Sequence, residues 1–249
     1  MSLDDRVKYA EMKARHQKKL RPWYLKWWGV IILVIIGLFL VALVSGSVYI
    51  YKEVKNIKNG TDLNYLKDQH QAYVDLINGP GGYTIGTSSP KISVVEFSDF
   101  GCPYCKESAP EIRQLLEDYK DSVQLTIRDY PIHDTSIDLA IAARCAGEQG
   151  KYWDAYDSLF LNQDNLTATS TITADLLSWA DFLQLDTAKF GTCLSDRRYL
   201  SLIKRDYDDG NSLQIQGTPT WFVNNYPITG AYSADKFKEL FDGILQQIN

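Results

Sequence analysis

Residues 91–105 read Lys91-Ile-Ser-Val-Val-Glu-Phe-Ser-Asp-Phe-Gly-Cys-Pro-Tyr-Cys105, and they contain the clearest local signals of the fold. Its first seven residues form a short apolar run rich in β-branched side chains, which predicts a strand over 91–97. After that run, apolar residues recur at helical spacing and predict an amphipathic helix over 103–119. The two cysteines therefore lie where a strand ends and a helix begins.

The elements that follow indicate an α/β fold. Residues 122–128 alternate apolar and polar side chains, as a second strand does, and a block with only helical spacing follows over about 131–212. The chain then ends in two strands around the turn Asn224-Asn225 and in a closing helix, over 220–223, 226–229 and 233–248. The predicted order is β-α-β, a helical insertion, and β-β-α.

The pair Cys102-Pro-Tyr-Cys105 has the spacing of a redox-active dithiol. On the first turn of a helix, backbone N–H groups stabilise a thiolate on the first sulfur and lower its pKa. Pro103 suits the first helical position, where its missing N–H has no cost. Half of a zinc site has the same spacing, but the other two cysteines, Cys145 and Cys193, do not form a second close pair. We therefore expect no metal and no other cofactor.

A run without any charged residue covers 27–51, with aromatic residues at both ends. Its length fits one membrane-spanning helix. Residues 1–26 hold eight Lys or Arg against three acidic residues, which predicts a cytoplasmic basic tail and an uncleaved signal anchor. A cleaved signal peptide and a buried core helix are the alternatives. Residues 52–82 are expected to be a stalk and linker, and residues 83–249 an extracytoplasmic domain.

The charge balance excludes one class of partner. The whole chain has a net charge of -5, and because its first 26 residues are basic, the remainder is strongly acidic. Nucleic-acid binding requires a positive surface, so we expect no nucleic-acid partner. The expected contacts are with the lipid bilayer, through residues 27–51, and with other proteins.

The motif Val94-Val-Glu-Phe-Ser-Asp-Phe-Gly-Cys-Pro-Tyr-Cys105 resembles the DsbA-like branch of the thioredoxin superfamily. Three further motifs agree with it in order and spacing: Arg144-Cys-Ala-Gly-Glu-Gln-Gly-Lys-Tyr-Trp153, Gly217-Thr-Pro-Thr-Trp-Phe222 and Gly230-Ala-Tyr-Ser233. The resemblance covers about 83–249. It implies a thioredoxin fold with a helical insertion, preceded here by one transmembrane helix.

The resemblance also implies roles for individual residues. Cys102 would be the nucleophile and Cys105 the resolving thiol. Pro219 would be a cis-proline facing the active-site disulfide, and Thr218 would offer backbone hydrogen bonds to an extended substrate. Glu96 would be a buried acid that moves protons to and from the second cysteine. The alternatives are that Pro219 is an ordinary trans turn proline and that Glu96 is a solvated edge carboxylate.

The remaining cysteines are expected to form a structural disulfide. Cys145 and Cys193 each follow an apolar residue at helical spacing, so both should face the interior of the helical block. The resemblance implies a bridge between them, and an oxidising compartment would favour it. Two free buried thiols are the alternative.

Together these features predict a membrane-tethered protein thiol-disulfide oxidoreductase in the plasma membrane. We expect it to donate disulfides to reduced exported polypeptides and to be reoxidised by a membrane redox partner. The alternatives are a disulfide reductase or isomerase and a non-catalytic binding or holdase module. Tyr104 stands where strongly oxidising members of the family have His, which implies a milder oxidant.

Overall fold

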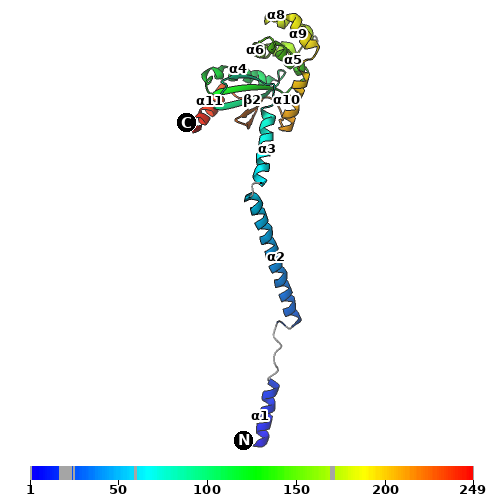
Figure 1. Ribbon diagram of the computed structural model, residues 1–249, viewed down its shortest axis with the longest axis vertical. Helices are drawn as coiled ribbons and strands as arrows, with labels where there is room; N and C mark the ends of the chain where they lie inside the picture. Colours follow the sequence, from blue (N-terminus) through cyan, green and yellow to red (C-terminus); the bar gives the residue numbers. More distant parts are fainter. Residues whose placement is uncertain (1, 17–23, 25, 59–60, 169–171, 249) are drawn as a thin grey trace. The chain divides into compact units, whose positions relative to one another are not determined.

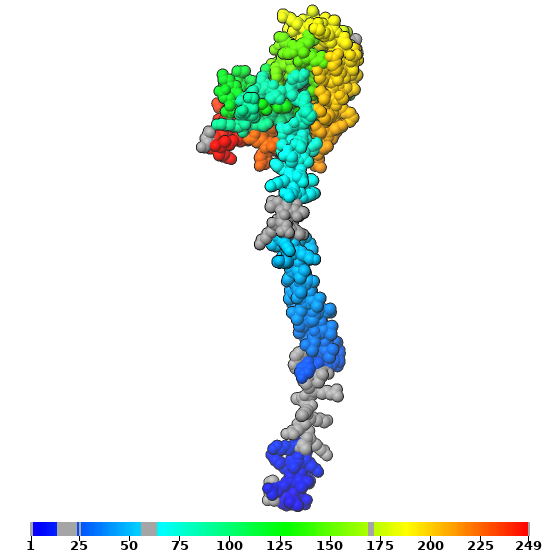
Figure 2. Space-filling model, in the orientation of Figure 1, coloured from blue at the N-terminus to red at the C-terminus, as the bar shows by residue number. Residues whose placement is uncertain are grey.

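The computed structural model describes residues 2–16, 24, 26–58, 61–168 and 172–248 (Figure 1). The chain divides into two units, Met1–Lys67 and Asp68–Asn249. Within the second unit, the helices α8 and α9 of the helical insertion, shown in yellow, form one end of that unit (Figure 2). Each unit is described separately below.

The first unit contains the helices α1 (Leu3–His16) and α2 (Trp27–Lys58). Among the described residues, one helical stretch is long and apolar enough to cross a membrane, Trp27–Lys55. Its 29 residues exceed the roughly 20 that a bilayer core requires. The helix continues past the predicted end of the anchor at Tyr51, so the start of the predicted stalk is helical.

A five-stranded sheet with the order β1-β3-β2-β4-β5 forms the centre of the second unit. The central pair β2 and β3 is parallel, whereas all the other pairs are antiparallel. The β4–β5 turn is formed by Asn224 and Asn225, both at positive φ (48° and 71°), as a two-residue hairpin turn requires. The strands are β1 (Tyr83–Gly86), β2 (Ile92–Ser98), β3 (Val123–Asp129), β4 (Thr220–Val223) and β5 (Tyr226–Thr229).

Helices cover both faces of the sheet. On one face Ile92 and Val94 of β2 pack in the main core, which includes α4, α11 and much of the insertion. On the other face Val95 and Phe97 join a smaller cluster with Ile77 of α3. The helices are α3 (Thr61–Ile77), α4 (Pro103–Asp118), α5 (Ser136–Gly147), α6 (Tyr152–Leu161), α7 (Gln163–Thr167), α8 (Ile172–Phe182), α9 (Thr187–Ser195), α10 (Leu200–Ser212) and α11 (Ala234–Ile248). This is a thioredoxin fold with a helical insertion between β3 and β4.

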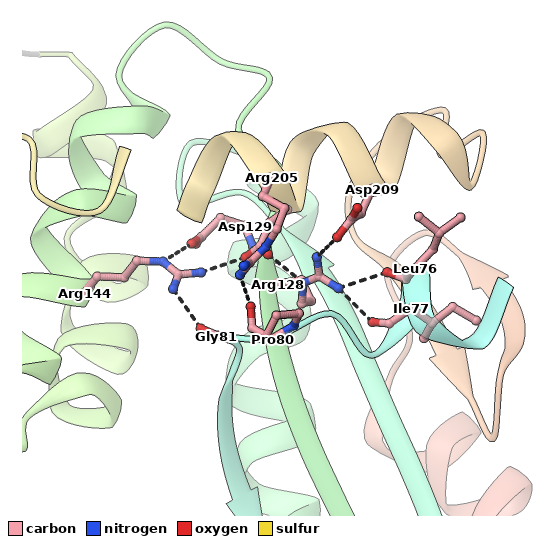
Figure 3. A network of polar contacts seen from close by, with 10 residues as sticks. Leu76, Ile77, Pro80, Gly81, Arg128, Asp129, Arg144, Arg205 and Asp209 are labelled. Carbon is pink, nitrogen blue, oxygen red and sulfur yellow. Dashed lines mark hydrogen bonds and ion pairs between the residues drawn. The ribbon is translucent and has the colours of Figure 1, made fainter. Parts of the chain in front are cut away.

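The C-terminal part of the predicted stalk belongs to the folded unit. Ile77 is fully buried. The buried Arg128 donates hydrogen bonds to the carbonyl oxygens of Leu76 and Ile77, at 2.9 and 3.0 Å. The buried Arg144 donates to the carbonyl oxygen of Gly81 at 2.8 Å (Figure 3). The compact unit accordingly begins at Asp68, before the boundary predicted at Tyr83.

A carboxylate from the insertion pairs with both of these arginines. Asp206 of α10 accepts from Arg128 at 2.8 Å and from Arg144 at 2.7 Å, and its side chain is fully buried. Buried charges are tolerated when they are paired and hydrogen-bonded in this way. The network therefore connects β3, the insertion and the segment that precedes β1.

Candidate active site

Cys102 occupies the junction between β2 and α4. It is the N-cap residue of α4, with extended backbone angles (φ -84°, ψ 125°), and Pro103 follows at the start of the helix. Both Cys102 and Cys105 are free thiols and both are buried, with 3% and 0% of their surfaces exposed. This arrangement is the dithiol form of a Cys-x-x-Cys pair at a helix N-terminus.

The surroundings of Cys102 favour its thiolate. A hydrogen bond from the Cys105 thiol is the largest cause that lowers the pKa of Cys102 to about 5. The Thr218 side chain and the backbone N–H groups of Cys105 and Tyr104 also lower it, whereas burial opposes the shift. Donors at a helix N-terminus stabilise a negative charge because their partial positive charges converge on it. Cys102 should therefore be ionised at neutral pH.

The surroundings of Cys105 and Glu96, in contrast, favour the protonated forms of these two residues. Burial raises the pKa of Cys105 well above its usual range, and the nearby Cys102 and Glu96 add to the rise. Burial likewise raises the pKa of Glu96 to about 7, although a hydrogen bond from the Tyr156 hydroxyl, at 3.2 Å to Oε2, opposes the shift. The site thus combines a thiolate, a neutral thiol and a carboxyl group that titrates near neutral pH.

The loop before β4 lies against Cys102. The peptide bond between Thr218 and Pro219 is cis. Sγ of Cys102 lies 3.3 Å from the backbone carbonyl oxygen of Thr218, to which the protonated thiol can donate a hydrogen bond. Thr218 and Pro219 are therefore brought to the same place as Cys102, as the resemblance implies.

Two buried side chains that the sequence did not indicate hold the turn before Cys102. Asp99 accepts a hydrogen bond from the backbone N–H of Gly101 at 2.7 Å, and its other oxygen lies 2.7 Å from Nδ1 of the exposed His133. Gln163 donates to the backbone carbonyl oxygens of Phe100 and Cys102. The Asp-x-Gly pattern is typical of an Asx turn and could have indicated Asp99, whereas no local pattern marks Gln163.

The other two cysteines lie in the insertion, in a different part of the fold. A disulfide joins Cys145 of α5 to Cys193 of α9, with 5.8 Å between their Cα atoms. Both residues are buried in the main core. Within the part of the chain that the structure describes, no group of three or more His, Cys, Asp or Glu side chains could hold a metal ion.

Comparison with known proteins places this arrangement in a family. The family model described as thioredoxin matches residues 78–243, which is most of the chain and all of the sheet. The chain belongs to the thioredoxin family. This thioredoxin-family protein shares its fold with two DsbA-like structures. Oxidised BdbD of Bacillus subtilis is 24% identical (TM-score 0.59), covering 66% of this chain and 92% of that one. The thiol-disulfide exchange protein alpha-DsbA2 of Wolbachia pipientis is 22% identical (TM-score 0.62), covering 73% and 96%.

A curated relative has a different overall organisation. The Na(+)/H(+) antiporter NhaA 3 of Salinispora tropica is 39% identical over 153 residues, which is 60% of this chain and 22% of the antiporter. This thioredoxin-family protein therefore spans about a quarter or less of the length of the curated relatives it matches. The similarity thus concerns one domain of a longer protein.

Proposed function

We propose that this protein is a membrane-tethered thiol-disulfide oxidoreductase that donates disulfides to reduced exported polypeptides. One observation carries the proposal: a Cys102 thiol whose pKa is lowered to about 5 and a buried Cys105 whose pKa is raised occupy one helical turn. A stabilised Cys102 thiolate is a good leaving group, and it also stabilises the reduced form of the pair. Both effects favour passing a disulfide on to a substrate.

The reaction would begin from a Cys102–Cys105 disulfide. A substrate thiolate attacks Sγ of Cys102, forming a mixed disulfide and expelling Cys105, which takes up a proton. A second substrate thiolate then attacks the substrate sulfur of the mixed disulfide and expels Cys102 as a thiolate. Two electrons pass from the substrate to the pair, and the substrate gains one disulfide. A membrane redox partner would remove the electrons and restore the Cys102–Cys105 disulfide.

We assign supporting roles to three further residues. Glu96, with its pKa of about 7, is suited to deliver the proton that Cys105 takes up and to remove it again on reoxidation. Thr218 would bind the extended substrate through its backbone, beside the buried Pro219. The Cys145–Cys193 disulfide would be structural and take no part in the exchange.

The test uses the full chain in detergent micelles, oxidised and mixed with a reduced, unfolded polypeptide that contains two cysteines. Wild-type protein should transfer close to one disulfide per chain. Cys105→Ser cannot form the Cys102–Cys105 disulfide and should transfer none; mixed in its reduced form with a polypeptide that already contains a disulfide, it should accumulate mixed disulfides at Cys102, because the resolving thiol is missing. Cys102→Ser should transfer none. The double variant Cys145→Ala/Cys193→Ala, which removes the other pair, is the matched control and should retain transfer.

Full transfer by Cys102→Ser would refute the assignment. Faster reduction of insulin than oxidation of the reduced polypeptide would favour the reductase or isomerase, and no exchange in either direction would favour a binding module. For the location, we propose a cytoplasmic N-terminus and an extracytoplasmic domain in the plasma membrane. External protease should then digest the domain in intact spheroplasts, and its survival there would contradict this topology.

A further inference from the structure

The turn of residues 99–102 carries the Cys102 sulfur, and two of its buried carbonyl groups, those of Phe100 and Cys102, share one side-chain partner. The side-chain amide nitrogen of Gln163 lies 2.9 Å from the carbonyl oxygen of Phe100 and 2.8 Å from that of Cys102. Gln163 is 3% exposed. It is the first residue of α7, in the helical insertion and more than sixty positions along the chain from the turn it holds.

The chemistry of these contacts defines the orientation of Gln163. Both partners are carbonyl oxygens, which accept hydrogen bonds and cannot donate them, so the NH2 group must face them. An amide NH2 has two hydrogens, and each is used for one carbonyl. The amide therefore bridges the Phe100–Gly101 and Cys102–Pro103 peptide units.

The Cys102–Pro103 peptide unit directly precedes the two peptide units whose N–H groups face the thiolate, those of Tyr104 and Cys105. The Cys102 carbonyl also accepts from the backbone N–H of Lys106, at 3.1 Å. With both contacts made, the Cys102 carbonyl is held in the first helical turn. The N–H groups of Tyr104 and Cys105, which stabilise the thiolate, then remain directed at Sγ.

We propose that Gln163 is a positioning residue for the thiol-disulfide reaction, because it holds the Phe100 and Cys102 carbonyls and so keeps the backbone donors aimed at the Cys102 sulfur. Through it the helical insertion sets the stability of the thiolate. The inference rests on the proposed role of Cys102 as the leaving thiolate. Asp99 holds the opposite side of the same turn through the Gly101 N–H.

The chain offers a matched control. Gln149, also in the insertion, makes two hydrogen bonds to the backbone of Asp186, accepting from its N–H at 2.8 Å and donating to its carbonyl oxygen at 3.3 Å. Gln163→Met and Gln149→Met therefore remove the same amide group and the same number of backbone contacts. The contacts of only one of them involve the turn before Cys102.

The experiment titrates the ultraviolet absorbance of the Cys102 thiolate against pH in the reduced full chain in detergent micelles, and equilibrates the same proteins with glutathione. Gln163→Met should raise the pKa of Cys102 by about one unit and shift the glutathione equilibrium about tenfold toward the disulfide form. Gln149→Met should change neither. Gln163→Asn, which keeps the amide but withdraws it by one methylene group, should shift both in the same direction by less.

A merely structural role for Gln163 predicts a different pattern. Gln163→Met would then lose thermal stability while the pKa of Cys102 and the glutathione equilibrium stay at their wild-type values, and that result overturns the inference. If Gln163→Met does not fold, Gln163→Asn decides by the same two readouts. An ordinary Cys102 pKa in the wild-type protein would instead remove the basis of the proposed function itself, so the two failures are distinguishable.

Discussion

The opposite pKa shifts of Cys102 and Cys105 predict how the reduction potential of the pair depends on pH. When the disulfide is reduced, each cysteine takes up a proton only if its pKa lies above the pH. The pKa of Cys102 is lowered to about 5 and that of Cys105 is raised above its usual range. Between about pH 5 and pH 9 reduction should therefore consume one proton, and below pH 5 it should consume two.

The magnitudes follow from the two-electron stoichiometry. One proton per two electrons gives a slope of about -30 mV per pH unit, and two protons give about -59 mV. At pH 7, lowering the Cys102 pKa from 9.0 to about 5 favours the reduced form up to about a hundredfold, or about 60 mV. We take about 60 mV as an upper value.

The assay is equilibration of the full chain with glutathione buffers at half-unit steps from pH 4 to pH 8.5, with the oxidised fraction counted by thiol alkylation. We expect a shallow slope above about pH 6 that steepens toward pH 4. A slope near -59 mV per unit throughout pH 6–8 would mean that Cys102 is protonated at neutral pH, which would refute the reasoning. The reduced Cys105→Ser protein supplies an independent value of the Cys102 pKa.

Two further predictions concern stability. The pKa of the Glu96 carboxyl is raised from 4.5 to about 7 in the folded protein. Because this carboxyl ionises at lower pH in the unfolded chain than in the folded one, the free energy of unfolding of the wild type should fall by about 3 kcal/mol as pH rises through this window. Glu96→Gln should remove that loss, which urea unfolding at pH 5 and pH 8 can measure; an equal difference between the proteins at both pH values would contradict it. The Cys145–Cys193 bridge closes a separation of 48 residues, so Cys145→Ala/Cys193→Ala should cost at most about 4 kcal/mol in the same assay. A variant as stable as the wild type would show that the bridge contributes nothing.

Much of the fold could be predicted because its signals are local. The strand at residues 91–97, the helix after Pro103 and the hairpin at Asn224-Asn225 each contain their own periodicity or turn residues, and the structure has all three. Strand β1 (Tyr83–Gly86) was not predicted. It is four residues long and pairs on one side only, with β3, so its stability comes from a partner about forty residues away rather than from its own sequence.

The burial of two polar residues, Arg128 and Gln163, could not be predicted for a related reason. The alternation of apolar and polar side chains over residues 122–128 predicts that Arg128 lies on the polar side of its strand. It is nevertheless fully buried, because Asp206 from α10 neutralises it there. Gln163 is likewise buried because it satisfies two carbonyl groups of a distant turn. Buried polar residues depend on partners, and a sequence pattern gives no information about partners from other elements.

Two buried arginines restrict how the chain can change length during evolution. Arg128 contacts the carbonyl oxygens of Leu76 and Ile77, and Arg144 contacts that of Gly81. Adding or deleting one residue between Leu76 and Gly81 would move an acceptor away from a buried guanidinium group and leave its N–H groups unpaired. A change before Asp68 alters none of these contacts. Insertions and deletions among related sequences should therefore collect ahead of Asp68, where the distance from the apolar helix can vary while the fold is inherited unchanged.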